Sequence, residues 1–323
     1  MKHFFAALSA LLVNLTLTPT ASACSPVSEG NLAVSTFGGE AMRLFEQRPR
    51  LFLENGAITQ EFYDRISKYT LQICEDHLFD ARVFQDHKLI TLDASLVGAM
   101  ANNSIALILG QFINAQQPNI PVTQLFEVWN TKHVPPLGQS APERPNIIDV
   151  ANQVAGFQVD LRRYPTNRDF ALDVSGPFVH SLAFVFLHEW CHVGLDHFSE
   201  GFADPETSRR LEEEADRCAI EVINLDEEAE GGLPGLNMIG AITALGTQIA
   251  FEAAWRASGD ITITNQSHPF PVERFEAMII LINDELDRRG EAAPITRSTL
   301  NGLIDASRRV ATHVEGAASS NQH

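Results

Sequence analysis

Apolar residues recur with helical spacing along most of this 323-residue chain. Phe62, Ile66 and Tyr69, for example, fall on one face of a helix. A looser alternation of apolar and polar residues ends in FQVDL, 157–161, which predicts one short strand. Helices are predicted over 40–48, 58–75, 93–117, 178–198, 205–225, 236–256, 271–288 and 295–312. We therefore expect a mainly α-helical protein with little sheet.

Proline and glycine divide the chain. The stretch 132–146, KHVPPLGQSAPERPN, predicts a long loop or a domain boundary. It separates a helical N-terminal region, 24–131, from a second domain, 147–323. The acidic stretch DEEAEGG, 226–232, is interpreted as a solvated loop after a helix. The role of 24–131 is open, and covering or gating a cleft in the second domain is one candidate role.

The first residues have the composition of an export signal. Lys2 precedes a mostly apolar run, and Ala21-Ser22-Ala23 has the small-x-small pattern of a signal-peptidase site. We interpret 1–23 as a signal peptide, so that the mature protein is expected to be periplasmic or secreted. Cys24 follows directly, and ASAC resembles a bacterial lipoprotein box with alanine where leucine is usual. A lipid anchor on Cys24 therefore stays open beside free secretion.

The negative net charge of the chain disfavours some classes of function. Charged residues make up 20% of the chain and the formal net charge is −18. Such an acidic chain is a poor match for nucleic acid or an anionic membrane surface. The uncharged stretch 232–251 contains Asn237, Thr243 and Gln248, so it predicts a buried core helix rather than a transmembrane span. We expect a soluble enzyme or protein-binding module with no transmembrane span in the mature chain.

Two histidines and a glutamate end the apolar run SLAFVFLHEWCH, 181–192. His188 and His192 are one helical turn apart on the same face, which is the spacing that H-E-x-x-H motifs use to bind zinc. Glu189 points about 100° round the helix and is the candidate general base for an attacking water. Burying these groups unpaired would cost several kcal/mol, and a metal ion removes that cost. A hydrogen-bonded core cluster is the alternative.

A third ligand is expected in the acidic stretch LEEEAD. Glu212 and Asp216 share one helical face. Glu212 is the candidate third zinc ligand, and Asp216 can accept the free ring N–H of a ligand histidine and fix its tautomer. Glu213 and Glu214 are interpreted as solvated, and His197 as a helix-end residue.

The four cysteines allow three disulfide pairings in an exported protein. Cys191 lies beside His192, and we favour a small buried thiol there over a fourth zinc ligand. A Cys191–Cys218 bridge between the two site helices is also open. Cys74 is interpreted as a buried thiol or a bridge partner.

Together these motifs resemble zinc peptidases of the gluzincin type. HEWCH followed by EEEAD is similar to the HtpX and CAAX-prenyl-protease family, whose signature is H-E-x-x-H and then E-x-x-x-D. SHPFPVERFEAM, 267–278, resembles that family's late H-P-x-x-x-x-R segment. The resemblance implies that His268 helps to hold the substrate carbonyl or oxyanion, and that Arg274 braces the site near the ligand carboxylate. FVFLHEWCHVGLDH also resembles the Lit-type phage-exclusion peptidases, another group with H-E-x-x-H.

The fold implied by this resemblance is mainly α, of the α+β zincin-like kind, with H-E-x-x-H on one helix and E-x-x-x-D on a second. We expect an exported zinc metalloendopeptidase with a protein or peptide substrate. One zinc ion per chain would be held by His188, His192 and Glu212, with Glu189 as general base. A non-proteolytic, chaperone-like envelope protein with a structural zinc is the alternative. Glu189 argues against it, because a structural site has no need of a general base.

Overall fold

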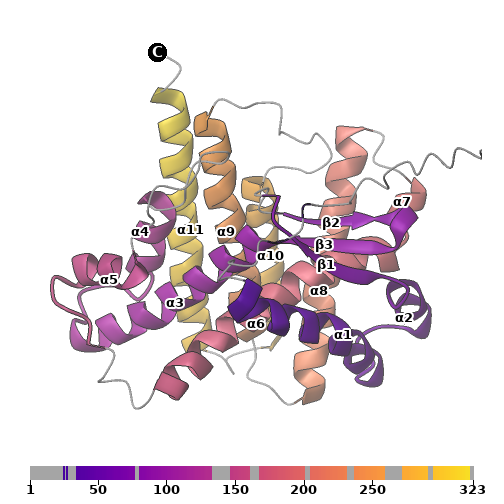
Figure 1. The fold of residues 1–323 in the computed structure, drawn as a ribbon, viewed down its shortest axis with the longest axis horizontal. Helices are drawn as coiled ribbons and strands as arrows, with labels where there is room; N and C mark the ends of the chain where they lie inside the picture. The colour runs from indigo at the N-terminus through magenta and orange to yellow at the C-terminus, as the bar shows by residue number, and fades with distance from the viewer. Residues whose placement is uncertain are drawn as a thin grey trace, which may run out of the picture.

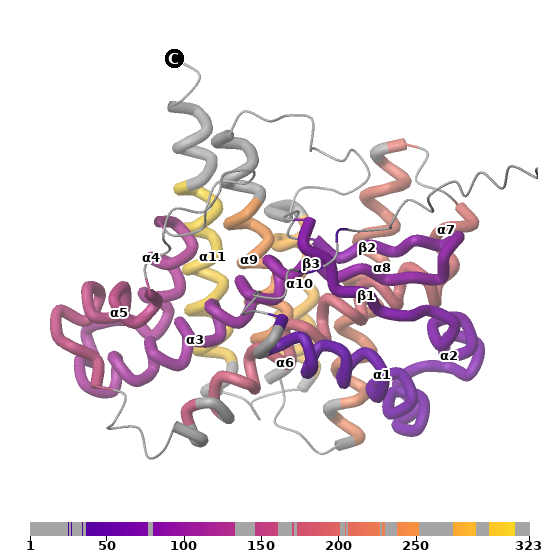
Figure 2. The backbone as a smooth tube through the Cα atoms, viewed as in Figure 1, coloured from indigo at the N-terminus to yellow at the C-terminus, as the bar shows by residue number. Residues whose placement is uncertain are grey.

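The computed structural model describes Ser25, Val27 and residues 34–76, 80–132, 146–160, 167–200, 204–230, 236–258, 271–289 and 294–320. Helices dominate these residues, and three short strands form one sheet (Figure 1). The expected mainly α fold is therefore confirmed. Helices α4 (Gln124–Lys132) and α5 (Ile147–Ala155) lie at one end of the molecule, and the sheet lies towards the other (Figure 2).

The N-terminal region contains all three strands of the sheet. Its elements are η1 (Val34–Gly38), α1 (Gly39–Glu54), α2 (Gln60–Ile66), β1 (Thr70–Cys74), β2 (Ala81–Phe84), η2 (Gln85–His87) and β3 (Leu89–Asp93). The central strand β3 runs parallel to β1 and antiparallel to β2. Ile90 and Leu92 of β3 are fully buried, so this face of the sheet belongs to the core.

The helix predicted over 58–75 is wrong in its second half. Helix α2 begins after Thr59, whose hydroxyl accepts a hydrogen bond from Phe62 N, and it ends at Ile66. Residues 70–74 are strand β1 instead. Apolar residues at 69, 71 and 73 alternate as a strand requires, while 62, 66, 69 and 73 also fit a helix. The apolar pattern therefore fits both a helix and a strand, and pairing with β3 selects the strand.

The remaining elements are helices. They are α3 (Ala94–Gln116), α4, α5, α6 (Asn167–Gly194), α7 (His197–Glu200), α8 (Pro205–Glu230), α9 (Leu236–Ser258), α10 (Pro271–Arg289) and α11 (Pro294–Ser320). The strand predicted at 157–161 is wrong for its described part, 157–160. This part follows the left-handed cap of α5 at Gly156, and Val159 N donates to Asn152 Oδ1 rather than to a strand. Most of the predicted loop 132–146 lies outside the described residues.

The acidic stretch 226–232 is not a solvated loop where the structure describes it. Helix α8 continues to Glu230. Asp226 is 5% exposed and accepts hydrogen bonds from Arg48 Nη1 at 3.0 Å and Asn55 Nδ2 at 2.7 Å. Arg48 lies on α1 and Asn55 caps its C-terminal end, so a contact with a distant segment stabilises the last turns of α8.

Helix α6 lies inside a hydrophobic core that both regions of the chain share. Its Trp190 packs against Phe45 of α1, with ring centroids 5.1 Å apart. The core helix predicted from the uncharged stretch 232–251 is confirmed for its described residues, since α9 is buried over most of 238–251. Among the described helices, α3 alone is long and apolar enough to cross a membrane, but 67% of its most apolar window is buried within the protein.

Candidate metal centre

The two helices predicted to carry the site lie against each other. Helix α6 carries the H-E-x-x-H motif and α8 carries the E-x-x-x-D motif. A disulfide between Cys191 and Cys218 joins them, with a Cα–Cα distance of 6.1 Å. The preferred reading of Cys191 as a buried thiol is therefore wrong, and the alternative bridge is confirmed. The described cysteines include no free thiol.

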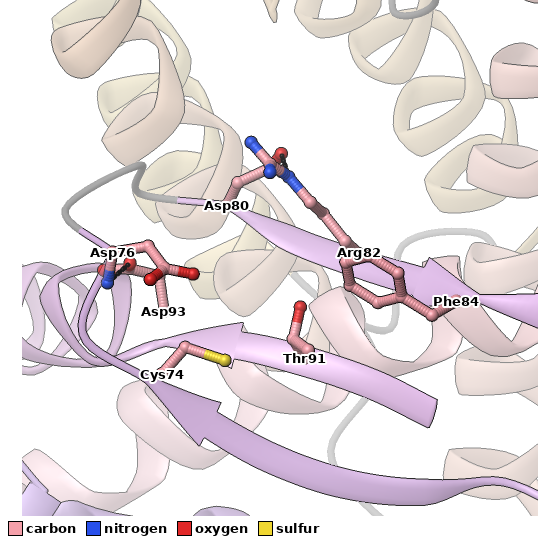
Figure 3. Close-up of a pocket in the computed structure, with 7 residues that line it drawn as sticks. All are labelled: Cys74, Asp76, Asp80, Arg82, Phe84, Thr91 and Asp93. Atoms are coloured by element: carbon pink, nitrogen blue, oxygen red, sulfur yellow. Dashed lines mark hydrogen bonds and ion pairs between the residues drawn. The ribbon is translucent and has the colours of Figure 1, made fainter. Parts of the chain in front are cut away.

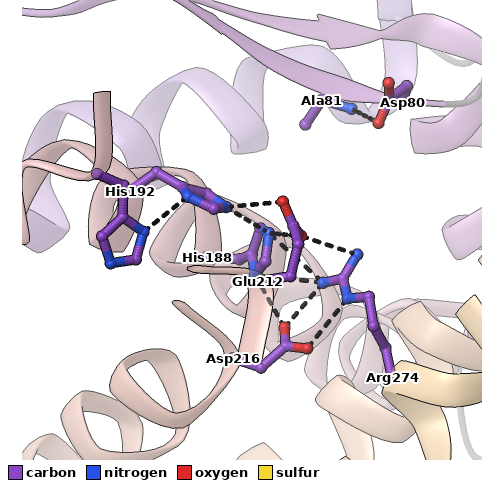
Figure 4. A network of polar contacts seen from close by, with 8 residues as sticks. Asp80, Ala81, His188, His192, Glu212, Asp216 and Arg274 are labelled. Atoms are coloured by element: carbon purple, nitrogen blue, oxygen red, sulfur yellow. Dashed lines mark hydrogen bonds and ion pairs between the residues drawn. The ribbon is translucent and has the colours of Figure 1, made fainter. Parts of the chain in front are cut away.

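His188, His192 and Glu212 form one buried cluster (Figure 4). His188 Nε2 lies 3.1 Å from His192 Nε2 and 3.1 Å from Glu212 Oε2. His192 Nε2 lies 3.3 Å from Glu212 Oε1. Donor atoms bound to one tetrahedral zinc ion at about 2.0–2.1 Å are about 3.3 Å apart. The spacing of these three side chains therefore fits a single zinc ion.

Asp216 and Arg274 support the first histidine from the opposite side. Asp216 Oδ1 lies 2.8 Å from His188 Nδ1, so the carboxylate can accept the ring N–H and leave Nε2 as the lone-pair nitrogen. Arg274, on α10, donates to the same carboxylate through Nε at 3.0 Å and Nη2 at 2.8 Å. Its Nη1 is also 3.6 Å from Glu212 Oε2. Arg274 is 7% exposed, so it is part of this cluster and not a surface residue.

Glu189 is buried beside the same group. Burial opposes the charge on Arg274, but the carboxylates of Asp216, Glu212 and Glu189 raise the pKa of Arg274 above its ordinary value. Glu189 is therefore close enough to act on the guanidinium, although it is not one of the three clustered metal-binding side chains. This location suits a carboxylate that works next to a metal rather than on it.

The buried charges of the cluster are unbalanced, and a bound cation would balance them. Three buried carboxylates, Glu189, Glu212 and Asp216, face one buried guanidinium, which leaves an excess of two negative charges when both histidines are neutral. Burial and Arg274 disfavour a charged His188, yet Asp216 and Glu212 raise its pKa to about 9. Burial lowers the pKa of His192 to about 4. The site thus stabilises positive charge at His188, and a divalent ion would balance the same carboxylates.

Local structure explains why α8 begins where it does. Asp204 is the N-cap, and its Oδ1 accepts from the backbone N of Glu206 at 3.0 Å and of Thr207 at 2.9 Å. Pro205 follows at the first helical position, where a missing N–H costs nothing. Glu212 and Asp216 then fall on consecutive turns that face α6.

Two neighbours of the centre were not expected from the sequence. His197 is 1% exposed, and its Nδ1 lies 3.0 Å from His192 Nδ1. Its Nε2 lies 3.4 Å from Glu214 Oε2, so Glu214 is not simply solvated. Burial lowers the pKa of His197 below its ordinary value. A histidine five residues after a candidate ligand is the one sequence signal that could have indicated this contact.

An acidic pocket lies at the sheet (Figure 3), and none of its lining residues belongs to the metal cluster. Its lining consists of Cys74, Asp76, Asp80, Arg82, Phe84, Thr91 and Asp93. Asp93 caps α3 by accepting from Ser95 N, and Asp80 pairs with Arg82 at 3.0 Å. These carboxylates therefore have partners within the protein.

Several predicted features lie outside the described residues. They are the signal peptide, the lipid-anchor candidate Cys24 and the oxyanion candidate His268. Each of them stays a prediction.

The comparisons with known proteins point to one enzyme class. The family model Peptidase U49 matches residues 150–293, less than half of the chain. That stretch includes His188, Glu189, His192, Glu212, Asp216 and Arg274. The match supports a peptidase, which acts on a protein or peptide, and it agrees with the Lit-type resemblance. The HtpX and CAAX-prenyl-protease likeness remains a resemblance of motifs. No curated protein and no solved structure matched the chain.

Proposed function

We propose that this protein is an exported zinc-dependent metalloendopeptidase. The observation that carries the proposal is the buried triangle of His188, His192 and Glu212, with Glu189 next to it in an acidic cluster. Its spacing fits the ligand set of a catalytic zinc site, in which three protein ligands leave one position open. The family match independently supports peptide hydrolysis.

Each side chain has a distinct role in the proposed reaction. His188, His192 and Glu212 would hold the ion. A bound zinc ion supplies Lewis-acid activation of a water and of the substrate carbonyl. Glu189 takes the proton from the attacking water and passes it to the leaving amine. Asp216 accepts a hydrogen bond from the Nδ1–H of His188, which keeps Nε2 available as the lone-pair nitrogen. Arg274 holds Asp216 through two hydrogen bonds.

Export is supported by two features. The first 23 residues have a signal-peptide pattern. The Cys191–Cys218 disulfide is typical of proteins from an oxidising compartment such as the periplasm. Free secretion fits these features. A lipid anchor would need the thiol of Cys24 outside a disulfide, and it stays the alternative.

The test is cleavage of an unfolded protein by purified residues 24–323, with the zinc content of each sample measured. We expect about one zinc ion per chain in wild type and cleavage of the substrate. Glu189→Gln should keep its zinc and lose activity by about 10²-fold or more, because it cannot accept the proton. The matched control is Glu213→Gln, an exposed residue on α8, which should behave as wild type.

The two readouts separate the alternatives. Zinc-free wild-type protein, purified without chelators, would rule out the proposed metal centre. Zinc-loaded wild type and Glu189→Gln with equal activity would rule out Glu189 as the base. Zinc in both with cleavage in neither would favour the structural-zinc alternative.

A further inference from the structure

We propose that His197 is a positioning residue that fixes the tautomer and orientation of the ligand His192. This inference rests on the proposed zinc site, because it concerns how one ligand of that site is prepared. It adds to the centre a residue that lies on a different helix, α7, from the two that carry the ligands.

The contact depends on a sharp turn after α6. On an unbroken helix, residues 192 and 197 would point about 140° apart. Helix α6 instead ends at Gly194, and Asp196 adopts a left-handed conformation with φ 63°. The chain reverses into α7 and places His197 Nδ1 3.0 Å from His192 Nδ1.

The turn is held from the N-terminal region. Arg65 Nη1 of α2 donates to Gly194 O at 2.7 Å. A Cβ atom at Gly194 would lie 2.2 Å from the ring of Phe62, so only glycine allows this approach. The end of α6, from which the chain turns towards His197, is therefore packed against α2.

The direction of each proton follows from the ligand role of His192. A neutral imidazole that binds metal through Nε2 carries its proton on Nδ1. This N–H needs an acceptor, and His197 Nδ1 is the nitrogen that faces it. His197 must then carry its own proton on Nε2. Glu214 Oε2 lies 3.4 Å from this nitrogen, within ion-pair distance but without hydrogen-bond geometry.

The chain of contacts ends at the surface in an ion pair between Glu214 and Arg210. Arg210 Nη1 donates to Glu214 Oε1 at 2.7 Å, and this leaves Oε2 on the side of His197. Glu214 has a side-chain exposure of 43%, whereas His197 is buried. Metal-binding histidines usually donate their second ring N–H to a carboxylate, a backbone carbonyl or a water. Here the buried imidazole of His197 stands at the acceptor position.

The two matched variants are similar in size, and only one of them has polar side-chain atoms. His197→Asn keeps an oxygen near the position of Nδ1, whereas His197→Leu fills similar space without an acceptor. Zinc affinity is measured by competition with a chelating dye in the full chain, residues 24–323. We expect His197→Leu to lose about 10- to 100-fold in affinity and His197→Asn to recover most of that loss. Glu214→Gln should have a smaller effect, and Glu213→Gln none.

A second measurement needs no variant. Nitrogen-15 spectra of histidine-labelled, zinc-loaded wild type report which ring nitrogen carries each proton. We expect a proton on His192 Nδ1 and on His197 Nε2. A proton on His197 Nδ1 would overturn the inference, and so would folded His197→Leu with wild-type affinity. Both results leave the zinc site intact, whereas zinc-free wild type would refute the proposed function itself.

Discussion

Two buried polar clusters in the same core differ in how their charges are balanced. Between α3, α4 and α9, the side chains of Asn103, Asn130 and Thr247 form a neutral network. Asn103 Nδ2 donates to Thr247 Oγ1 at 2.5 Å and to Asn130 Oδ1 at 3.3 Å. Asn130 Nδ2 donates to Asn103 Oδ1 and to Phe126 O, so each amide hydrogen has an acceptor.

The metal cluster is equally buried but is not balanced by the protein alone. Its carboxylates outnumber its guanidinium, and its histidine nitrogens face one another at 3.1 Å. The amide network is complete without a ligand, because neutral donors and acceptors match in number. Burial of polar groups does not by itself indicate function. An excess of negative charge around histidine nitrogens that point at one another does.

Removal of the metal should give the largest effect, because only the metal cluster is expected to depend on a bound ion. With zinc at about 1,000 times its Kd, chelation is expected to lower the free energy of unfolding of wild type by about 4 kcal/mol. It should also abolish peptidase activity. Glu212→Gln should bind zinc weakly and respond little to chelator, because one ligand charge is gone. Urea denaturation with and without chelator gives the result, with Glu213→Gln as control. A wild type that is insensitive to chelator would contradict the expected coupling.

Removal of the disulfide should have the next largest effect. Cys191 and Cys218 are 27 residues apart, and a bridge over a loop of this length contributes about 3.5 kcal/mol. We expect the double variant Cys191→Ala/Cys218→Ala to unfold at lower urea concentration and to bind zinc less tightly, because α6 and α8 are no longer tied. Substitution is preferable to a reductant, since Cys74 is also disulfide-bonded. Equal zinc affinity in the variant would show that packing alone aligns the two helices.

The neutral network should affect stability without affecting the metal. Asn103→Ala leaves groups of Asn130 and Thr247 without their partner, and this is expected to cost about 2–3 kcal/mol. Zinc content per folded chain should stay at the wild-type value. Gln111→Ala, an exposed position on the same helix, should change stability by less than about 0.5 kcal/mol. Loss of zinc in folded Asn103→Ala would show that the two clusters are coupled.

The N-cap of α8 should give the smallest effect, and one that depends on pH. The hydrogen bond from the backbone of Thr207 is the largest cause that lowers the pKa of Asp204 below its ordinary value. A carboxyl group with a lowered pKa stabilises the fold above its unfolded-state pKa, and this contribution is lost as the pH falls through its folded-state pKa. Asp204→Ala should therefore reduce Tm slightly at pH 7, and the difference should shrink in acid. A difference that does not change with pH would exclude the charged cap as its cause.

Sequence alone determined the local part of the site. The spacings of His188 with His192 and of Glu212 with Asp216 define helix faces over four residues, and such short-range geometry needs no knowledge of the fold. Long helices such as α8 and α9 were predicted for the same reason. The peptidase class was accessible through the order of the motifs, and the family match supports it.

The tertiary structure decided what depends on distant partners. Residues 70–74 became a strand through pairing with β3. The end of α8 stayed helical through contacts with Arg48 of α1 and with Asn55, the C-cap of that helix. Four cysteines allow three pairings, and only the approach of α6 to α8 selected Cys191 with Cys218. His197 reached His192 because the chain turns at Asp196. In each case the number of residues between the partners does not determine their distance in space. The sequence alone therefore could not predict these contacts.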